Sequence, residues 1–159
     1  MVFAFHTVEA YVNFAGEIMA PELWRDERNS FRDPPYRGWT GKLRKLMETV
    51  GLPWLDEERP LKTVLELKDL RDFIAHGRSE VLDGTLLHDE PDMPYPTSKL
   101  RSLFTPKRKM PSVLPDVETF LNEIHVRVKP NVQDPWFGSE ALRGPRMSLG
   151  RSTSLSPKD

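Results

Sequence analysis

The chain has 159 residues, of which 38% are apolar and 15 are proline, and it carries a net charge of −1. A chain of this length forms one domain with a modest core, and its near-zero charge gives no bulk attraction to nucleic acid, so phosphate contacts would need a local basic patch. The absence of cysteine excludes disulfides, zinc ribbons and thiol catalysis, and it permits a reducing compartment.

The first residues, MVFAFHTVEAYVNF, are apolar enough to be compared with an export signal. They lack a basic start, and His6, Glu9 and Asn13 interrupt the apolar run. No segment approaches the ~20 consecutive apolar residues that a membrane span needs. The sequence therefore predicts a soluble cytoplasmic protein without membrane contact.

The first expected element is an amphipathic helix over residues 2–20. Its apolar side chains recur at i, i+3, i+4 and i+7, which places them on one stripe: Val8, Tyr11, Val12, Ala15, Ile18 and Met19. Pro21 either ends this helix or begins another turn. Residues 25–38 are charged and contain Pro34 and Pro35, so we expect a loop there.

Two further helices are expected before the middle of the chain. Residues 39–50 have a shared apolar face, and Gly51 provides a stop signal. The third helix is the clearest, because Pro60 suits its first turn and Gly77 closes it. Its continuous apolar stripe consists of Leu61, Val64, Leu67, Leu70 and Ile74.

The pattern weakens after the third helix. Residues 78–115 are expected to form an irregular insert, and Asp116 is expected to cap a fourth helix that ends near Val128. Residues 129–159 are rich in Ser, Pro, Gly and Arg and predict a flexible tail. The predicted fold is thus an all-α bundle of about four helices over residues 1–128, with a long irregular C-terminal part.

The end of the third helix contains the residues that are candidates for phosphate binding and acid–base catalysis. At about 100° per residue, Arg71 lies only about 40° from Leu67, the centre of the apolar stripe. A guanidinium keeps its charge, so a half-buried one needs an anion, a carbonyl cluster or a subunit interface. Asp72 and His76 are four residues apart and share a face, so the carboxylate can bind one imidazole nitrogen and leave the other as base or acid.

Arg71 and His76 are separated by about 140° around the same helix. A single helix therefore does not aim both side chains at one phosphate, whereas two copies that meet across a dimer axis would. An alternative needs no ligand: Arg71 pairs with an acid of a neighbouring helix, and His76 only ends its own helix. Glu9 and Glu17 of the first helix are the acids that offer such a pair.

The segment Leu70–Gly77, LRDFIAHG, resembles the signature of HEPN domains, in which an Arg, a polar residue, three further residues and a His lie near the end of a helix. The stretch Thr7–Asn13, TVEAYVN, resembles the opening helix of several HEPN subfamilies. Residues Pro60–Leu67, PLKTVLEL, resemble the approach to the motif. The resemblance covers roughly residues 3–80, or half of the chain.

This resemblance implies a metal-independent endoribonuclease without a cofactor, which acts at a homodimer interface as a toxin of a toxin–antitoxin pair or as an antiviral effector. His76 would be the general acid and base, Arg71 the clamp on the phosphate, and Asp72 the group that orients the histidine. The implied partners are RNA, a second copy and a cognate antitoxin protein. The alternative is a non-catalytic HEPN module that binds RNA, a nucleotide or another protein.

A basic stretch over residues 99–109 contains no acid, and its candidate RNA contacts are Lys99, Arg101, Lys107, Arg108 and Lys109. A solvated loop explains these charges equally well. His6, His88 and His125 have no metal-ligand spacing with each other or with acids, so no role is assigned to them. A third interpretation of the whole chain is a purely structural helical domain.

Overall fold

The computed structural model describes residues 2–76, 110–133, 137–138 and 140–142. The described elements, in chain order, are α1 (Val2–Met19), α2 (Pro21–Arg25), α3 (Glu27–Ser30), α4 (Gly38–Thr49), α5 (Leu61–Ala75), α7 (Met110–Val128) and the 3-10 helix η2 (Lys129–Asn131). No strand occurs among these residues. The predicted all-α bundle is confirmed, and its four long helices are α1, α4, α5 and α7.

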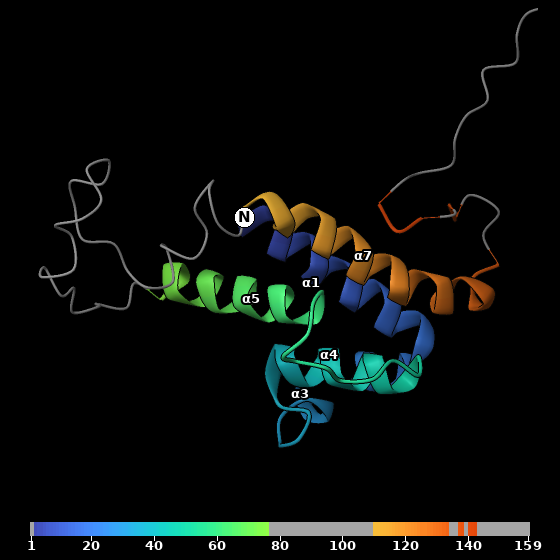
Figure 1. Ribbon diagram of the computed structural model, residues 1–159. Coiled ribbons are helices and arrows are strands. Elements are labelled where there is room, and N and C mark those ends of the chain that lie inside the picture. Colours follow the sequence, from blue (N-terminus) through green and yellow to red (C-terminus); the bar gives the residue numbers. More distant parts are fainter. Residues whose placement is uncertain (1, 77–109, 134–136, 139, 143–159) are drawn as a thin grey trace, which may run out of the picture.

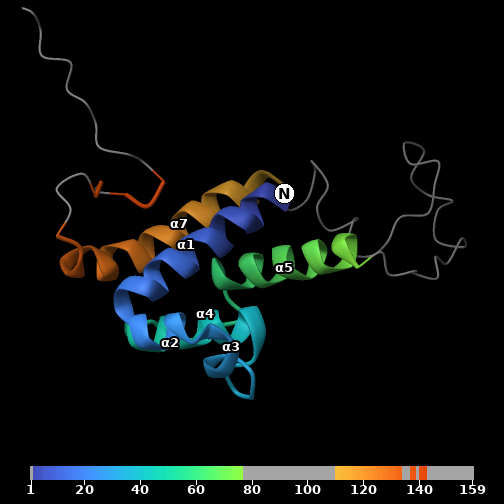
Figure 2. The ribbon, with the colours of Figure 1, turned by 180° about the vertical axis from the view of Figure 1, so that it is seen from behind.

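Helix α1 is the element around which the bundle is assembled, since it contacts α2, α4, α5 and α7. Figures 1 and 2 show α7 running beside α1 in the same direction, and α5 running beside α1 in the opposite direction. The C-terminal end of α5 therefore lies beside the N-terminal end of α1 and extends beyond it.

The apolar stripes that the sequence predicts meet in one core. Its fully buried residues come from all four long helices and include Phe5, Val8, Val12, Ala15, Leu43, Leu46, Val64, Leu121 and Ile124. The stripe of α5 is correct as far as Leu70, which is 3% exposed, but Ile74 is 53% exposed. Ile74 belongs to the last turn of α5, the end that extends beyond the start of α1, so none of the described helices covers it there.

Pro21 begins another turn, which is one of the two alternatives that the sequence left open: it is the first residue of α2, and Trp24 of this helix is buried. The predicted loop over residues 25–38 contains the short helix α3. The indole packs where Gly16 has no side chain, since a Cβ on that glycine would lie 2.0 Å from the Trp24 ring. Phe31 meets the same indole edge-on at 4.9 Å. Aromatic burial therefore organises a segment that reads as polar.

Asp116 does not cap the fourth helix as predicted. Helix α7 begins earlier, at Met110, and it accommodates Pro115 near its N-terminal end, where the missing N–H removes a single helical hydrogen bond. Asp116 is buried and accepts hydrogen bonds from Arg59 at 2.8 and 2.6 Å and from the Thr63 hydroxyl at 2.5 Å. The carboxylate thus joins α7 to the start of α5.

The predicted flexible tail begins directly after α7, and its described parts pack back onto that helix. The Phe137 ring stacks on His125, with 4.4 Å between the ring centroids. The Gly138 carbonyl accepts a hydrogen bond from His125 Nε2 at 3.0 Å, and the Ala141 N–H donates one to Asn122 Oδ1 at 2.8 Å. The first part of the tail is therefore held by specific contacts.

The predicted irregular insert lies outside the described residues up to position 109, and from position 110 onward it is the first part of α7. None of the helices that the structure describes combines the length and the apolar character needed to cross a membrane.

The contacts of Asp116 make a stability prediction. We expect Asp116→Ala to lower the free energy of unfolding by about 2–3 kcal/mol, because the substitution leaves the Thr63 hydroxyl and the Arg59 guanidinium without their shared acceptor. Urea unfolding followed by circular dichroism measures the change. Asp69→Ala is the matched control, since its carboxylate is 62% exposed and should contribute less than about 0.5 kcal/mol. Equal effects of the two substitutions would contradict the proposed link.

Candidate functional site

Arg71 lies at the contact between α5 and α1. Its guanidinium carbon is 4.6 Å from the centre of the Phe5 ring, and its side chain is 22% exposed. Nη2 lies 3.5 Å from Glu9 Oε1 on α1. The half-buried arginine therefore has an anion from a neighbouring helix, as its position on the apolar stripe predicts. Of the two acids that the sequence offered, Glu9 is the partner, while Glu17 is exposed two turns further along α1.

Asp72 binds the cations that precede it rather than the histidine that follows it. Its Oδ1 lies 2.7 Å from Arg71 Nη1, and its Oδ2 lies 2.9 Å from Lys68 Nζ. Side chains on a helix lean toward its N-terminus, so a short carboxylate meets the residue four positions earlier more readily than the one four positions later. The bond that joins Asp72 to His76 is instead between backbone atoms, from the His76 N–H to the Asp72 carbonyl at 3.0 Å.

The charges around Asp72 decide its protonation. Burial raises the pKa of this carboxyl, but the hydrogen bond from Lys68 and the positive charges of Lys68, Arg71 and His76 lower it by more, so the pKa of Asp72 lies below its ordinary value. Asp72 is therefore an anion at neutral pH. It acts on this end of α5 as a fixed negative charge between two cations.

His76 is the C-terminal cap residue of α5, and its side chain is exposed. It lies at the end of the helix that extends beyond α1. Among the described residues, no hydrogen bond or ion pair joins the His76 ring to Arg71. Within a single chain the Arg71 guanidinium therefore lies against α1, whereas the His76 imidazole lies in solvent beyond the start of α1. This agrees with the angular separation of the two residues that helical geometry predicts.

His6 is a further histidine at this site, and sequence analysis gave it no role. Its Nδ1 lies 3.3 Å from Glu9 Oε2, on the carboxylate whose other oxygen faces Arg71. Glu9 therefore links an imidazole of α1 to the guanidinium of α5. The His–Glu spacing of three residues was visible in the sequence, but its connection to Arg71 depends on the packing of two helices.

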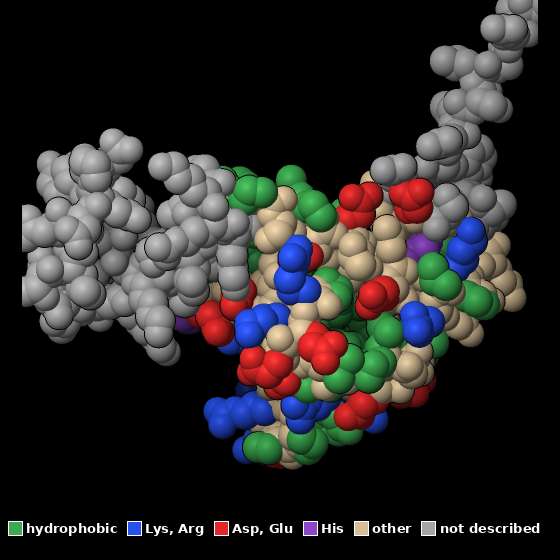
Figure 3. Space-filling view, in the orientation of Figure 1, with side chains coloured by type: hydrophobic (Ala, Val, Ile, Leu, Met, Phe, Trp, Pro, Cys, Tyr) green, Lys and Arg blue, Asp and Glu red, His purple; other side chains and the backbone are tan. Residues whose placement is uncertain are grey.

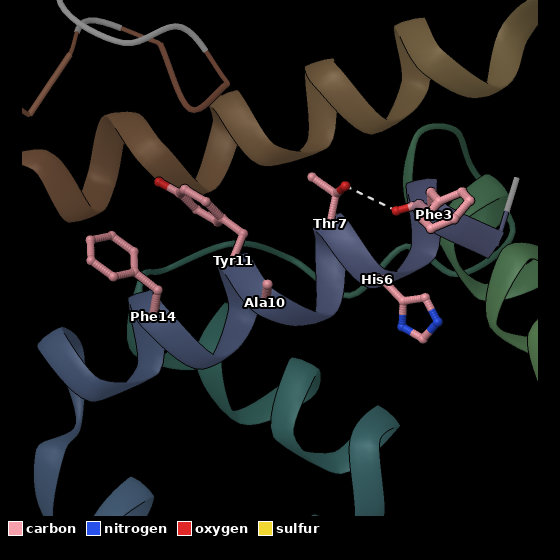
Figure 4. A pocket seen from close by; sticks show the side chains of 6 residues that line it. All are labelled: Phe3, His6, Thr7, Ala10, Tyr11 and Phe14. Carbon is pink, nitrogen blue, oxygen red and sulfur yellow. Dashed lines mark hydrogen bonds between the residues drawn. The ribbon is translucent and has the colours of Figure 1, made fainter.

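An open groove of about 550 Å³ follows the exposed side of α1 next to this ionic cluster, and it is lined by Phe3, His6, Thr7, Ala10, Tyr11 and Phe14. Figure 4 shows the small side chains of Thr7 and Ala10 between the rings of Phe3 at one end and Phe14 at the other. Phe3 is 85% exposed. His6 belongs to both the groove and the ionic cluster.

His125 is a structural histidine. It is 2% exposed, its Nε2 donates to the Gly138 carbonyl, and its Nδ1 accepts a hydrogen bond of 2.6 Å from the Tyr11 hydroxyl. Burial raises the pKa of Tyr11 to about 12, so the hydroxyl keeps its proton as the donor. Both ring nitrogens are used within the protein, which leaves none for a substrate.

Other candidate residues cannot be placed. The basic side chains Lys99, Arg101, Lys107, Arg108 and Lys109 all lie outside the described residues, as does Gly77. Within the part of the chain that the structure describes, no three His, Asp or Glu side chains gather closely enough to hold a metal ion.

No protein-family model, curated protein or solved structure matches this chain. The chemistry of the site must therefore be inferred from the contacts of its own residues.

The contact between Arg71 and Glu9 makes a second stability prediction. We expect Glu9→Ala to lower the free energy of unfolding by about 1 kcal/mol, because the guanidinium remains partly buried after it loses an acceptor. Thermal and urea unfolding measure the loss. Glu17→Ala removes a carboxylate from the same helix at an exposed position and should change stability by less than about 0.3 kcal/mol. The pairing would be refuted by two variants of equal stability.

The lowered pKa of Asp72 predicts a dependence of stability on pH. A carboxyl whose pKa is lower in the folded state stabilises the protein above its ordinary pKa of 3.8, and this contribution is lost as the pH falls through the lower folded value. Asp72→Asn should therefore be less stable than the natural chain by about 0.5 kcal/mol above about pH 5, with a difference that shrinks below about pH 4. Urea unfolding of both proteins at a series of pH values across this range measures the difference in stability. A difference that does not change with pH would contradict the prediction.

Proposed function

We propose that this chain is a HEPN-like, metal-independent endoribonuclease that cleaves RNA by attack of a ribose 2′-OH on the adjacent phosphate. In the cell it would act in the cytoplasm, as the toxin half of a toxin–antitoxin pair or as an antiviral effector. The proposal is supported by the resemblance of Leu70–Gly77 to the HEPN signature and by the exposed position of His76, five residues after Arg71. The pairing of Arg71 with Glu9 is also what the alternative without a ligand predicts.

Each of these residues has a role that fits its surroundings. The guanidinium of Arg71 stabilises negative charge that develops on the phosphate, and an arginine already fixed by two carboxylates loses little side-chain entropy when it does so. His76 is exposed and able to exchange protons with a substrate. Asp72 fixes the guanidinium, which replaces its predicted role of orienting the histidine ring.

A homodimer fits this arrangement. Ile74 of α5 is 53% exposed and Phe3 of α1 is 85% exposed, and both lie toward the end of the bundle where α5 passes the start of α1. Burial of both side chains against a second copy would remove apolar surface from water. A second copy at this end would bring two copies of the motif together and enclose the space between them.

A second candidate function is a non-catalytic module that binds RNA, a nucleotide or a protein. The neutralisation of Arg71 favours the protein-binding form of this module, because Glu9 and Asp72 compete with any phosphate for the guanidinium. Figure 3 shows the same mixture more widely, with acidic and basic side chains side by side over α5. Such a surface gives no strong general attraction to a polyanion.

An RNA cleavage assay in the presence of EDTA separates the two candidates. The natural chain should cut RNA without added metal and leave 2′,3′-cyclic phosphate ends, and His76→Ala should lower the rate at least about 100-fold, since proton transfer by a placed imidazole contributes this much or more. The fold should survive, because the His76 side chain is exposed.

Asp69→Asn is the control for this assay, as Asp69 lies exposed on α5 two residues before Arg71 and should not affect the rate. Undiminished cutting by His76→Ala would remove this residue from the mechanism. Binding of RNA without any cutting by the natural chain would replace the nuclease with the binding module.

A further inference from the structure

We propose that His6 is the second proton-transfer residue of the Arg71 site, so that one chain carries both imidazoles that RNA cleavage needs. The inference rests on the proposed nuclease function and extends it, since it adds a residue of α1 to a site described so far on α5. It also gives each copy in a homodimer a base and an acid of its own.

The contact with Glu9 prepares His6 to accept a proton. An ionised carboxylate only accepts hydrogen bonds, so the His6 nitrogen that faces it, Nδ1 at 3.3 Å, carries the ring proton when the imidazole is neutral. The other nitrogen, Nε2, then has a free lone pair. Because the His6 side chain is 52% exposed, a substrate in solvent can reach it.

The same carboxylate places His6 beside the guanidinium, since its second oxygen faces Arg71. His6 precedes Glu9 by three residues, or about 4.5 Å along α1, and His76 follows Arg71 by five residues, or about 7.5 Å along α5. The two helices run in opposite directions (Figures 1 and 2), so both displacements point toward the same end of the bundle. The two imidazoles therefore lie on the same side of the Glu9–Arg71 pair.

A base, an acid and a guanidinium near one another are the groups that this cleavage requires. His6 Nε2 takes the proton of the 2′-OH, the 2′-oxygen forms its bond to phosphorus, and Arg71 stabilises the charge on the phosphate oxygens. The bond from phosphorus to the 5′-oxygen breaks as protonated His76 gives that oxygen a proton. His6 gains one proton and His76 loses one, and the products are a 2′,3′-cyclic phosphate and a 5′-hydroxyl.

The groove on α1 points to single-stranded RNA as the substrate. Phe3 lies one turn before His6, lines the same groove and is 85% exposed, so its ring offers a face on which a base can stack. A base is free to stack in this way only when it is unpaired. Stacking beside the imidazole would hold the neighbouring phosphate near His6 and Arg71.

The first test measures binding of an RNA that cannot be cleaved. The probe is a single-stranded octanucleotide that contains each base twice and is 2′-O-methylated, so that it cannot be cut. Imidazole ¹⁵N resonances of His6 and His76 should both shift during the titration, with one common dissociation constant. Glu9→Gln should change the His6 nitrogen resonances toward a mixture of the two neutral tautomers, which a loss of stability alone would not do.

The second test reads cleavage of the unmethylated octanucleotide. His6→Ala should lower the rate at least about 100-fold, as expected for a lost proton-transfer group, while Glu17→Ala on the same helix leaves it unchanged. Mixing His6→Ala with His76→Ala should not restore activity if both imidazoles serve the same chain's site. Restored activity in the mixture would mean that the two residues come from different copies, and the inference would be wrong.

The remaining outcomes separate the inference from the proposed function. Probe binding that shifts His76 alone, or full activity of His6→Ala beside an inactive His76→Ala, overturns the role of His6 and leaves the nuclease intact. A natural chain that binds the probe through both histidines and cuts nothing overturns both proton-transfer roles. A natural chain that neither binds nor cuts overturns the proposed function and the inference with it.

Discussion

The contact between Arg71 and Glu9 is the constraint on which the site depends. A guanidinium that packs on the Phe5 ring and is mostly covered must keep an anion beside it, and the anion comes from α1. The close-packed apolar side chains of the core set how α5 lies on α1. The pair adds a polar contact between the two helices, and His6 and His76 lie beyond it on α1 and α5.

This fixed arginine also determines what its neighbours do. Asp72 contacts Arg71 from the side of α5 and is also bound by Lys68, and among the described residues no hydrogen bond joins its carboxylate to the His76 ring. His76 in turn keeps its imidazole in solvent. The network thus separates residues that hold the guanidinium from residues free to exchange protons, which is the division that an acid–base site needs.

Sequence patterns predicted those features that depend on a single helix. The stripes of α1 and α5, the stop near Gly51, where φ is +70°, and the placement of Arg71 among apolar residues all follow from periodicity and backbone preference. The features that sequence patterns did not predict depend on contacts between different elements. Asp116 looked like a cap because its partners lie on other elements, and Ile74 looked buried because nothing in its own helix shows where α1 begins.

The supply of hydrogen-bond donors explains how Arg71 can be paired and still bind a phosphate. A guanidinium has five N–H groups, and Asp72 and Glu9 each approach a different Nη atom. Each Nη therefore keeps a second N–H for a phosphate, whereas the Nε–H is buried, has no acceptor among the described residues and is not accessible to a phosphate. The charges of Glu9, Lys68, Arg71 and Asp72 cancel, so this group orients a phosphate more than it attracts one. Affinity for RNA must then come from other contacts, and the exposed ring of Phe3 in the groove on α1 offers one.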